Sequence, residues 1–375
     1  MFKEGLRFMP IGDSEHRSLP RDIVVIGASA GGVEALTTFV AHLPRDLPAA
    51  LFVVVHIPSE ASSSLAQILS RAHTLPARSA RDKTPIEHGH IYIAPPDRHL
   101  LLTADEARVV SGPRENRHRP DIDPLFRSAA VSFGRRVVGI VLSGALNDGT
   151  AGLLAIKRAG GIAMVQDPAT AAFPGMPKSA LAYVSIDWSL SLPALADMVV
   201  ELATGEMLDL EGSVTMEEMD DEQKSEMRVE ADIAGLNPRA VTQALHYGRV
   251  SSYTCPDCHG PLWEIQDGPL LRFRCRVGHA FTAESMFEGQ ADNVEEALWM
   301  TLNILEESEQ LYTRLASDAR ERQHRWMSEQ FEQKLRTIKD RSAVIRQLLV
   351  DDSAQSTSST GNETDADETD AEEQA

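Results

Sequence analysis

The sequence IVVIGASAGG at residues 23–32 joins four apolar residues to a turn of glycines and other small residues. A buried strand that ends in such a turn and leads into a helix is the opening unit of a parallel α/β sheet. The pattern returns along the chain. Apolar runs predict buried strands at 23–26, 51–55, 137–142 and 162–166, and helices are expected at 31–43, 62–72, 123–134, 149–159 and 192–203. We therefore predict an α/β fold with a doubly wound, mostly parallel sheet over residues 22–204.

The stretch from 76 to 111 interrupts this alternation. Short strands are expected near 90–94, 99–102 and 107–110, separated by turn-forming residues. This spacing predicts a small β-hairpin insertion in the α/β domain.

The net charge of −20 is concentrated in two segments. Residues 205–232 hold eleven Asp and Glu against two Lys and Arg, and residues 351–375 hold nine acidic residues and no basic one. Because the rest is nearly neutral, no concentrated basic face supports nucleic-acid binding. No stretch resembles a signal peptide or a membrane span, which predicts a cytoplasmic protein without direct membrane insertion.

Composition and pattern divide the chain into six segments. We expect an N-terminal extension at 1–21, the α/β domain at 22–204, an acidic linker at 205–250, a zinc-ribbon-like unit at 251–287, an amphipathic helical segment at 288–350 and a disordered acidic tail at 351–375. The helical segment suits one long helix or a helical hairpin. Because an acidic linker offers little to a core, we expect residues 1–204 to fold without the rest.

All three cysteines lie in the expected zinc-ribbon-like unit. Cys255 and Cys258 are followed by Cys275 and His279, which together supply the four donors of a structural zinc site. His259 is an alternative fourth ligand. Two strands that meet at Asp267-Gly268 would bring the two pairs of ligands together, so we expect a structural Zn²⁺ with a role in folding or in docking other signalling proteins.

The opening turn is compatible with two kinds of site. A dinucleotide site needs G-x-G-x-x-G and an acidic residue after the second strand, but the glycines fall at 27, 31 and 32, and His56 follows that strand. The turn does match G-x-S-x-G, in which a sharp bend exposes a nucleophilic Ser29. A nucleotide-binding protein therefore remains only a distant alternative.

Possible partners for Ser29 follow two other predicted strands. His56 ends the second strand, and Asp148 lies in the turn after the strand at 137–142. Because the carboxyl ends of parallel strands share one edge of a sheet, Ser29, His56 and Asp148 can meet there as nucleophile, base and orienting acid. The chain order Ser, His, Asp differs from that of α/β-hydrolases, which argues against that fold.

With these residues in place, residues 22–204 resemble the catalytic domain of the CheB family, the chemotaxis protein-glutamate methylesterases. The matching motifs are GASAGG at 27–32, HIP at 56–58, IYIAP at 91–95, DPLFRSAA at 123–130, NDG at 147–149, QD at 166–167 and GMP at 175–177. The resemblance implies the triad Ser29, His56 and Asp148 and no catalytic cofactor. It covers about half of the chain.

The resemblance also implies a reaction and a partner. The expected activity is hydrolysis of γ-glutamyl methyl esters on cytoplasmic chemoreceptor helices, with glutamine deamidation through the same intermediate. We expect the N–H groups of Ala30, Gly31 and Gly32 to bind the oxyanion. Arg117, Arg119 and Met176 are candidates for substrate recognition.

This chain departs from the family pattern at a few positions. Ala30 replaces the usual Thr, and Ala145-Leu146 stands where the family has Met. These changes keep open a second reading, a catalytically weak adaptor or binding module in a signalling complex. About twenty residues precede the first strand, too few for the receiver domain of many members, so we expect no phosphorylation in cis.

Overall fold

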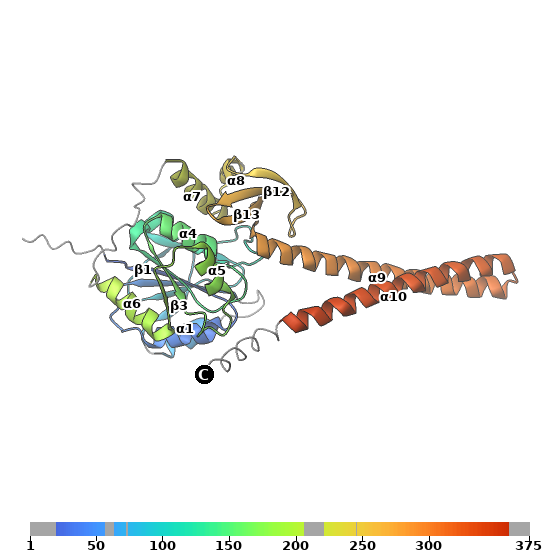
Figure 1. The fold of residues 1–375 in the computed structure, drawn as a ribbon, viewed down its shortest axis with the longest axis horizontal. Coiled ribbons are helices and arrows are strands. Elements are labelled where there is room, and N and C mark those ends of the chain that lie inside the picture. The colour runs from blue at the N-terminus through green and yellow to red at the C-terminus, as the bar shows by residue number, and fades with distance from the viewer. Residues whose placement is uncertain (1–19, 57–63, 73, 206–220, 245, 360–375) are drawn as a thin grey trace, which may run out of the picture. The chain divides into compact units, whose positions relative to one another are not determined.

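The computed structural model describes residues 20–56, 64–72, 74–205, 221–244 and 246–359 (Figure 1). The expected extension at 1–21, the linker at 205–250 and the tail at 351–375 therefore lie partly outside the described residues. The described chain divides into two compact units, one ending at Phe287 and the other beginning at Glu288.

A seven-stranded sheet forms the centre of the first unit, and all of its strand pairs are parallel. In sheet order, its strands are β10 (Trp188–Leu190), β9 (Ile162–Gln166), β8 (Val137–Val141), β1 (Ile23–Ala28), β2 (Ala50–Val55), β5 (Ile91–Ile93) and β3 (Ala77–Ser79). The chain winds outward from β1 in both directions. The predicted parallel α/β fold is confirmed, and the reversal of strand order falls between β1 and β8, where such sheets bind ligands.

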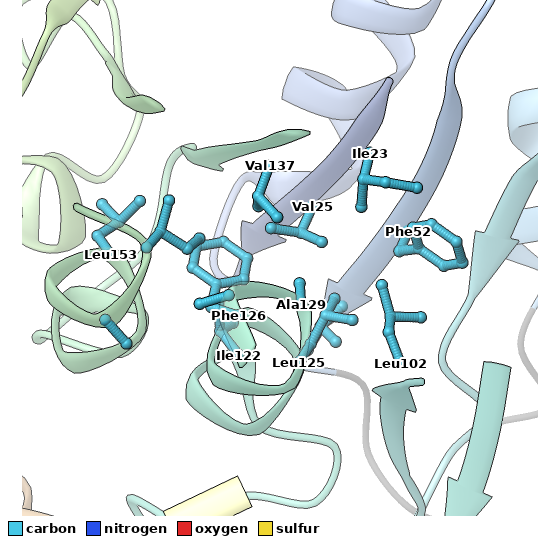
Figure 2. Close-up of a cluster of buried hydrophobic side chains, with 14 of the residues drawn as sticks. Ile23, Val25, Phe52, Leu102, Ile122, Leu125, Phe126, Ala129, Val137 and Leu153 are labelled. Carbon is cyan, nitrogen blue, oxygen red and sulfur yellow. The ribbon is translucent and has the colours of Figure 1, made fainter. Parts of the chain in front are cut away.

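Helices cover both faces of this sheet (Figure 1). One apolar core contains side chains of α3, α4 and α5, and the other contains side chains of α1, α2 and α6. Figure 2 shows Phe126 and Leu125 of α3 packed against Val25 and Phe52 of the sheet. The helices are α1 (Gly32–Ala41), α2 (Leu65–Ser70), α3 (Ile122–Phe133), α4 (Thr150–Arg158), α5 (Gly175–Tyr183) and α6 (Leu192–Thr204), and a 3₁₀ turn spans Gly134–Arg136.

The insertion differs from the prediction in one strand. The strand expected near 90–94 is β5, which pairs in parallel with β2 and is buried, so it belongs to the main sheet. The hairpin consists of β6 (His99–Leu102) and β7 (Glu106–Val110), and β4 (Thr84–Pro85) adds a third antiparallel strand.

Two helices lie in the range for which composition predicts a linker. They are α7 (Asp221–Ala234) and α8 (Pro238–Ala244). Met227 of α7 is buried in the same apolar core as Phe126, and Val229 and Ile233 are buried with Ala240 of α8. Many acidic residues lie between these apolar residues. The composition of the segment therefore indicates a linker and does not reveal their helical spacing. Residues 1–204 alone would lack this cover, so the expectation that they fold independently loses its basis.

The segment that carries the cysteines is a four-stranded antiparallel sheet, here called the Cys₃His module (249–282). Its strands are β11 (Arg249–Thr254), β12 (Pro261–Asp267), β13 (Leu270–Cys275) and β14 (Ala280–Thr282). The expected hairpin is present as β12 and β13, which pair from Leu262 with Cys275 to Asp267 with Leu270. The outer strands β11 and β14 are additional to the prediction.

The second unit is an antiparallel helical hairpin, one of the two arrangements that the apolar spacing predicts. It contains most of α9 (Ala283–Glu321) and all of α10 (Arg325–Ser359). Arg346 pairs with Glu306, and Lys339 lies 3.4 Å from Glu309. None of the helices in the described ranges combines the length and apolar character of a membrane span.

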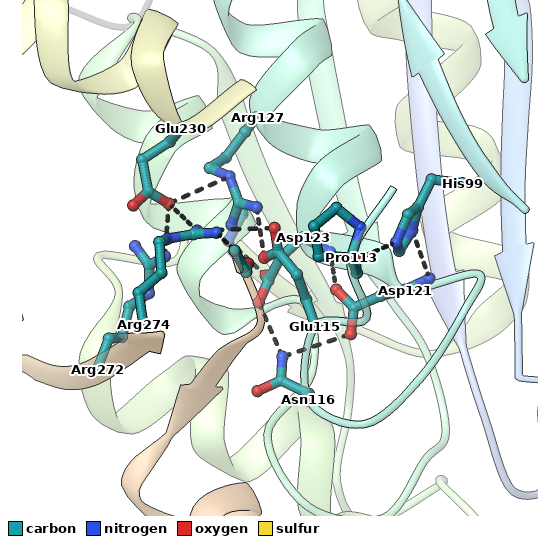
Figure 3. Close-up of polar contacts among 12 residues, drawn as sticks. His99, Pro113, Glu115, Asn116, Asp121, Asp123, Arg127, Glu230, Arg272 and Arg274 are labelled. Carbon is teal, nitrogen blue, oxygen red and sulfur yellow. Dashed lines mark hydrogen bonds and ion pairs between the residues drawn. The ribbon is translucent and has the colours of Figure 1, made fainter. Parts of the chain in front are cut away.

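A buried cluster of charges joins α3 to α7 and to the Cys₃His module (Figure 3). Its members are Glu115, Arg127, Glu230, Arg272 and Arg274. Glu230 Oε2 lies 2.6 Å from Arg272 Nη2 and 2.8 Å from Arg274 Nη2. Burial raises the pKa of Glu230, but the surrounding guanidinium groups more than offset this, so its pKa lies well below the ordinary value.

We expect Glu230→Gln to lower the free energy of unfolding by about 3 kcal/mol at neutral pH, because it leaves buried arginines without a carboxylate. A depressed pKa in the folded chain contributes stability above the ordinary pKa of Glu, and this contribution is lost as the pH falls toward the folded value. The difference in the free energy of unfolding between wild type and Glu230→Gln should therefore become smaller below about pH 4.5. Urea unfolding followed by circular dichroism at several pH values measures it.

Glu226→Gln is the matched control on the same helix. Burial raises the pKa of Glu226, so removing its charge should leave the unfolding midpoint unchanged or slightly higher. Equal midpoints for wild type and Glu230→Gln at neutral pH would contradict the importance of the cluster.

Candidate active site

Three loops meet at the carboxyl edge of the parallel sheet, following β1, β2 and β8. Ala28 is the register partner of Val55, so Ser29 and His56 occupy equivalent positions directly after neighbouring strands. His56 N donates to Ala28 O at 3.3 Å, and Ser29 N donates to Ser143 O at 3.0 Å. Adjacent strands lie about 4.8 Å apart, which brings the backbones of Ser29 and His56 close together.

The turn after β1 is shaped by Gly31, whose φ of 67° is left-handed. A Cβ there would lie 3.0 Å from Ser143 Oγ and 3.1 Å from Ala172 Cβ, so both conformation and space require glycine. Gly32 N donates to Ser29 O at 2.9 Å, which occupies one of the three expected oxyanion donors. Within the described ranges, the N–H groups of Ala30 and Gly31 have no hydrogen-bond partner.

His56 and Asp148 form a close polar pair. His56 Nε2 lies 2.6 Å from Asp148 Oδ2, although the angle of the contact departs from that of a hydrogen bond. Nδ1 is thus the ring nitrogen left for a hydroxyl group. Among the described residues, no hydrogen bond joins Ser29 Oγ to His56, and apo sites often have such bonds open.

Asp148 is buried and ionised. Its carboxylate accepts hydrogen bonds from Gly149 N at 2.7 Å and Ile122 N at 3.1 Å. Burial raises the pKa of Asp148, but the adjacent His56 ring, His118 and the Ile122 N–H outweigh this, so the net shift is downward. The carboxylate can therefore orient an imidazole ring and stabilise its cation.

His118 covers the other side of His56. The two rings stack with centroids 3.9 Å apart and planes 20° apart. The pKa of His118 is lowered to about 4, mainly by burial and secondly by electrostatic repulsion from His56. The His118 ring is therefore neutral at physiological pH. The sequence suggests for His118 only a place in the basic loop with Arg117 and Arg119, because its stack on His56 joins residues far apart in sequence.

The side-chain amide of Asn116 joins Asp148 to two further buried carboxyl groups, Asp121 and Asp123. Figure 3 shows Asn116 next to Asp121 and Asp123. Asn116 Nδ2 lies 3.2 Å from Asp123 Oδ2 and 3.4 Å from both Asp121 Oδ2 and Asp148 Oδ1. Burial and the charge of Asp148 raise the pKa of Asp123 to about 7 and that of Asp121 well above its ordinary value. Asn116 sits in a loop without a periodic pattern, so no sequence signal identified it.

The candidates for substrate recognition need correction at two positions. Met176 is fully buried and packs directly against Gly144. A Cβ built on Gly144 would lie only 2.0 Å from Met176 Sδ. Met176 is therefore a core residue beneath the turn and is not available to a substrate. Arg119 lies in an ion pair with Asp97 at 2.7 Å and donates to Gly112 O, which occupies its guanidinium. Arg117 has a left-handed φ of 69° in the same loop.

The four expected metal-binding residues gather at one end of the Cys₃His module. Their donor atoms, from Cys255, Cys258, Cys275 and His279, all lie within 4.8 Å of one another. Cys255 Sγ and Cys275 Sγ are 3.7 and 3.6 Å from His279 Nδ1, and Cys258 Sγ is 3.7 Å from Cys275 Sγ. His259, the alternative ligand, is not part of this group.

The α/β domain is similar to known proteins. Residues 24–199 match the family model described as CheB methylesterase. A crystal structure of the Thermotoga maritima CheB methylesterase catalytic domain is 32% identical and has a TM-score of 0.47, covering 48% of this chain and 98% of that domain.

Several sequence relatives carry the name protein-glutamate methylesterase/protein-glutamine glutaminase. One from Yersinia pestis is 38% identical over 50% of this chain and 54% of its own length, and one from Geobacter metallireducens is 41% identical over 46% and 49%. A relative from Leptospira interrogans, whose assignment to the same activity is provisional, is 38% identical over 48% of this chain and 94% of its own length. The chain therefore belongs to the CheB methylesterase family.

Proposed function

We propose that this protein is a protein-glutamate methylesterase and protein-glutamine glutaminase. The observation that carries the proposal is the convergence of Ser29, His56 and Asp148 at the carboxyl edge of one parallel sheet. The names of the relatives support the choice of substrate. We further propose a cytoplasmic location, with which three free cysteines agree.

Ser29 Oγ attacks the γ-carbonyl carbon of a methylated glutamate. His56 removes the hydroxyl proton through Nδ1, because Nε2 faces Asp148. Asp148 orients the ring and stabilises the imidazolium. The tetrahedral intermediate collapses, methanol leaves with the proton from His56, and water then hydrolyses the acyl-enzyme. Glutamine follows the same steps with ammonia as the leaving group.

The oxyanion requires hydrogen-bond donors at the turn that carries Ser29. Ala30 and Gly31 are the proposed donors, because the Gly32 N–H is held by Ser29 O. These backbone groups lie at the N-terminus of α1, where the helix dipole favours developing negative charge. We propose that the substrates are methylated glutamates on chemoreceptor helices, and that other signalling proteins bind the C-terminal region.

We expect Ser29→Ala to reduce methanol release from methylated chemoreceptor cytoplasmic fragments by at least about 10³-fold. Asp148→Asn should reduce it by orders of magnitude, because the imidazole would lose its orienting carboxylate. Ser132→Ala is a matched control. Ser132 lies in the last turn of α3, and its hydroxyl donates to Leu102 O and takes no part in the proposed triad. Near wild-type release by Ser29→Ala would remove the proposed nucleophile.

We also propose a structural zinc ion in the Cys₃His module. A tetrahedral site with Zn–S bonds of about 2.3 Å has ligand–ligand distances near 3.7 Å, which fits the observed spacing of the donors. Both ligand pairs sit on turns closed by backbone hydrogen bonds, His259 N to Cys255 O and Gly278 N to Cys275 O. Such an ion would stabilise the module and leave no open position for a substrate.

Metal analysis of untagged protein should find about one zinc per chain. Cys258→Ser should lower this stoichiometry sharply, whereas His259→Ala should leave it unchanged, because His259 lies outside the group of donors. Metal-free wild type, or loss of zinc in His259→Ala only, would contradict the assignment of these ligands.

A further inference from the structure

The start of α9 reaches the surroundings of Asp148 through two asparagines. Thr282 and Ser285 form a reciprocal cap: Ser285 N donates to Thr282 Oγ1 at 3.2 Å, and Thr282 N donates to Ser285 Oγ at 3.0 Å. Both side chains are almost fully buried. They belong to the same compact unit as the sheet, so their contacts with it are part of one body.

This cap holds the amide of Asn116 from its oxygen side. Ser285 Oγ donates to Asn116 Oδ1 at 2.8 Å, and Thr282 N donates to it at 3.1 Å. The amide nitrogen therefore faces the opposite way, toward Asp148, Asp121 and Asp123. The reversed amide would place an oxygen among three carboxyl groups, so the chemistry of its neighbours determines its orientation.

The backbone of Asn116 is held by the same module. Asn116 N donates to Ala280 O at 2.8 Å, and Glu115 and Ala280 form an isolated parallel bridge. The φ of Asn116 is 46°, a left-handed conformation that asparagine tolerates better than most residues. Both ends of this residue are thus fixed by residues 280–285.

A second asparagine next to Asp148 is held in the same way. Thr282 Oγ1 donates to Asn147 Oδ1 at 2.9 Å, and Asn147 Nδ2 donates to Glu284 Oε2 at 2.6 Å. The turn that carries Asp148 therefore also rests on the start of α9.

We propose that Asn116 is a positioning residue for Asp148, and that residues 280–285 set its orientation, so that the C-terminal module supports the catalytic acid. This inference rests on the proposed function. Asn116 Nδ2 lies 3.4 Å from Asp148 Oδ1 and supplies an N–H donor to this carboxylate, within a cluster of three buried carboxyl groups. Besides Asp121 and Asp123, the titratable groups next to Asp148 are His56 and His118, and the backbone N–H groups of Ile122 and Gly149 also donate to its carboxylate.

Removing the donor should make Asp148 easier to protonate. In the full chain, we expect Asn116→Gly to shift the acid limb of the pH–rate profile to higher pH by about one pH unit. At pH values below the limb, activity should be about tenfold lower than that of wild type. Glycine accepts the left-handed backbone, so strain is not the cause. Asn116→Asp keeps the size of the side chain but replaces the donor with a fourth carboxyl group. Its acid limb should therefore lie at a higher pH than that of Asn116→Gly.

The link to the module is tested by Ser285→Ala, which removes one of the two donors to Asn116 Oδ1. We expect a smaller shift of the acid limb in the same direction. Ser251→Ala is the matched control, because its hydroxyl bonds only Leu262 O and Tyr253 N within the module. Its profile should equal that of wild type.

Two readouts separate this inference from the proposed function. The first is methanol release from methylated receptor fragments, and the second is the rate at which a fluorophosphonate labels Ser29, which needs the activated serine but no natural substrate. Labelling of Ser29 without methanol release would contradict the proposed substrate. The pH dependence of labelling would still test the role of Asn116. A uniform loss at all pH values, or a wild-type limb in Asn116→Gly and Asn116→Asp, would overturn the positioning role. A wild-type limb in Ser285→Ala would overturn the link to the module.

Discussion

The buried pairing of Glu230 with Arg127, Arg272 and Arg274 is the interaction on which the arrangement of the first unit depends. Burying a single charge costs several kcal/mol, and only partners close at hand offset that cost. Here Glu230 belongs to α7, and its partners come from α3 and β13. The burial of this charge therefore ties the α/β domain, the acidic helix and the Cys₃His module to one another.

The same constraint acts on the carboxyl groups around the candidate site. Asp121, Asp123 and Asp148 are all buried close together, and three negative charges there would repel one another strongly. The pKa values of Asp121 and Asp123, the latter about 7, are raised, whereas that of Asp148 is lowered. Negative charge in the cluster is therefore favoured on Asp148, whose Oδ2 lies 2.6 Å from His56 Nε2, where an imidazolium would form.

Local patterns in the sequence predicted the strands, most helices and the edge at which Ser29, His56 and Asp148 meet, because each depends on a few neighbouring residues and on the parallel sheet. They also predicted that Cys255, Cys258, Cys275 and His279 come together. They did not predict α7, whose apolar residues are diluted by acidic ones, or Asn116, which gains its meaning only from residues 280–285. Met176 was assigned to the substrate although the core encloses it. Long-range packing decides these cases, and no local spacing reports it.

The proposed metal-binding residues are linked to the edge of the sheet by a short stretch of chain. His279 is followed at once by Ala280, whose N–H donates to Arg114 O and whose carbonyl accepts from Asn116 N. Thr282, two residues further, caps α9 and bonds to Asn147. A change in the turn that holds His279 therefore has only one to three residues in which to be absorbed before it reaches the neighbours of Asp148. The short connection places the Cys₃His module within the support of the site, although none of its residues belongs to the proposed triad.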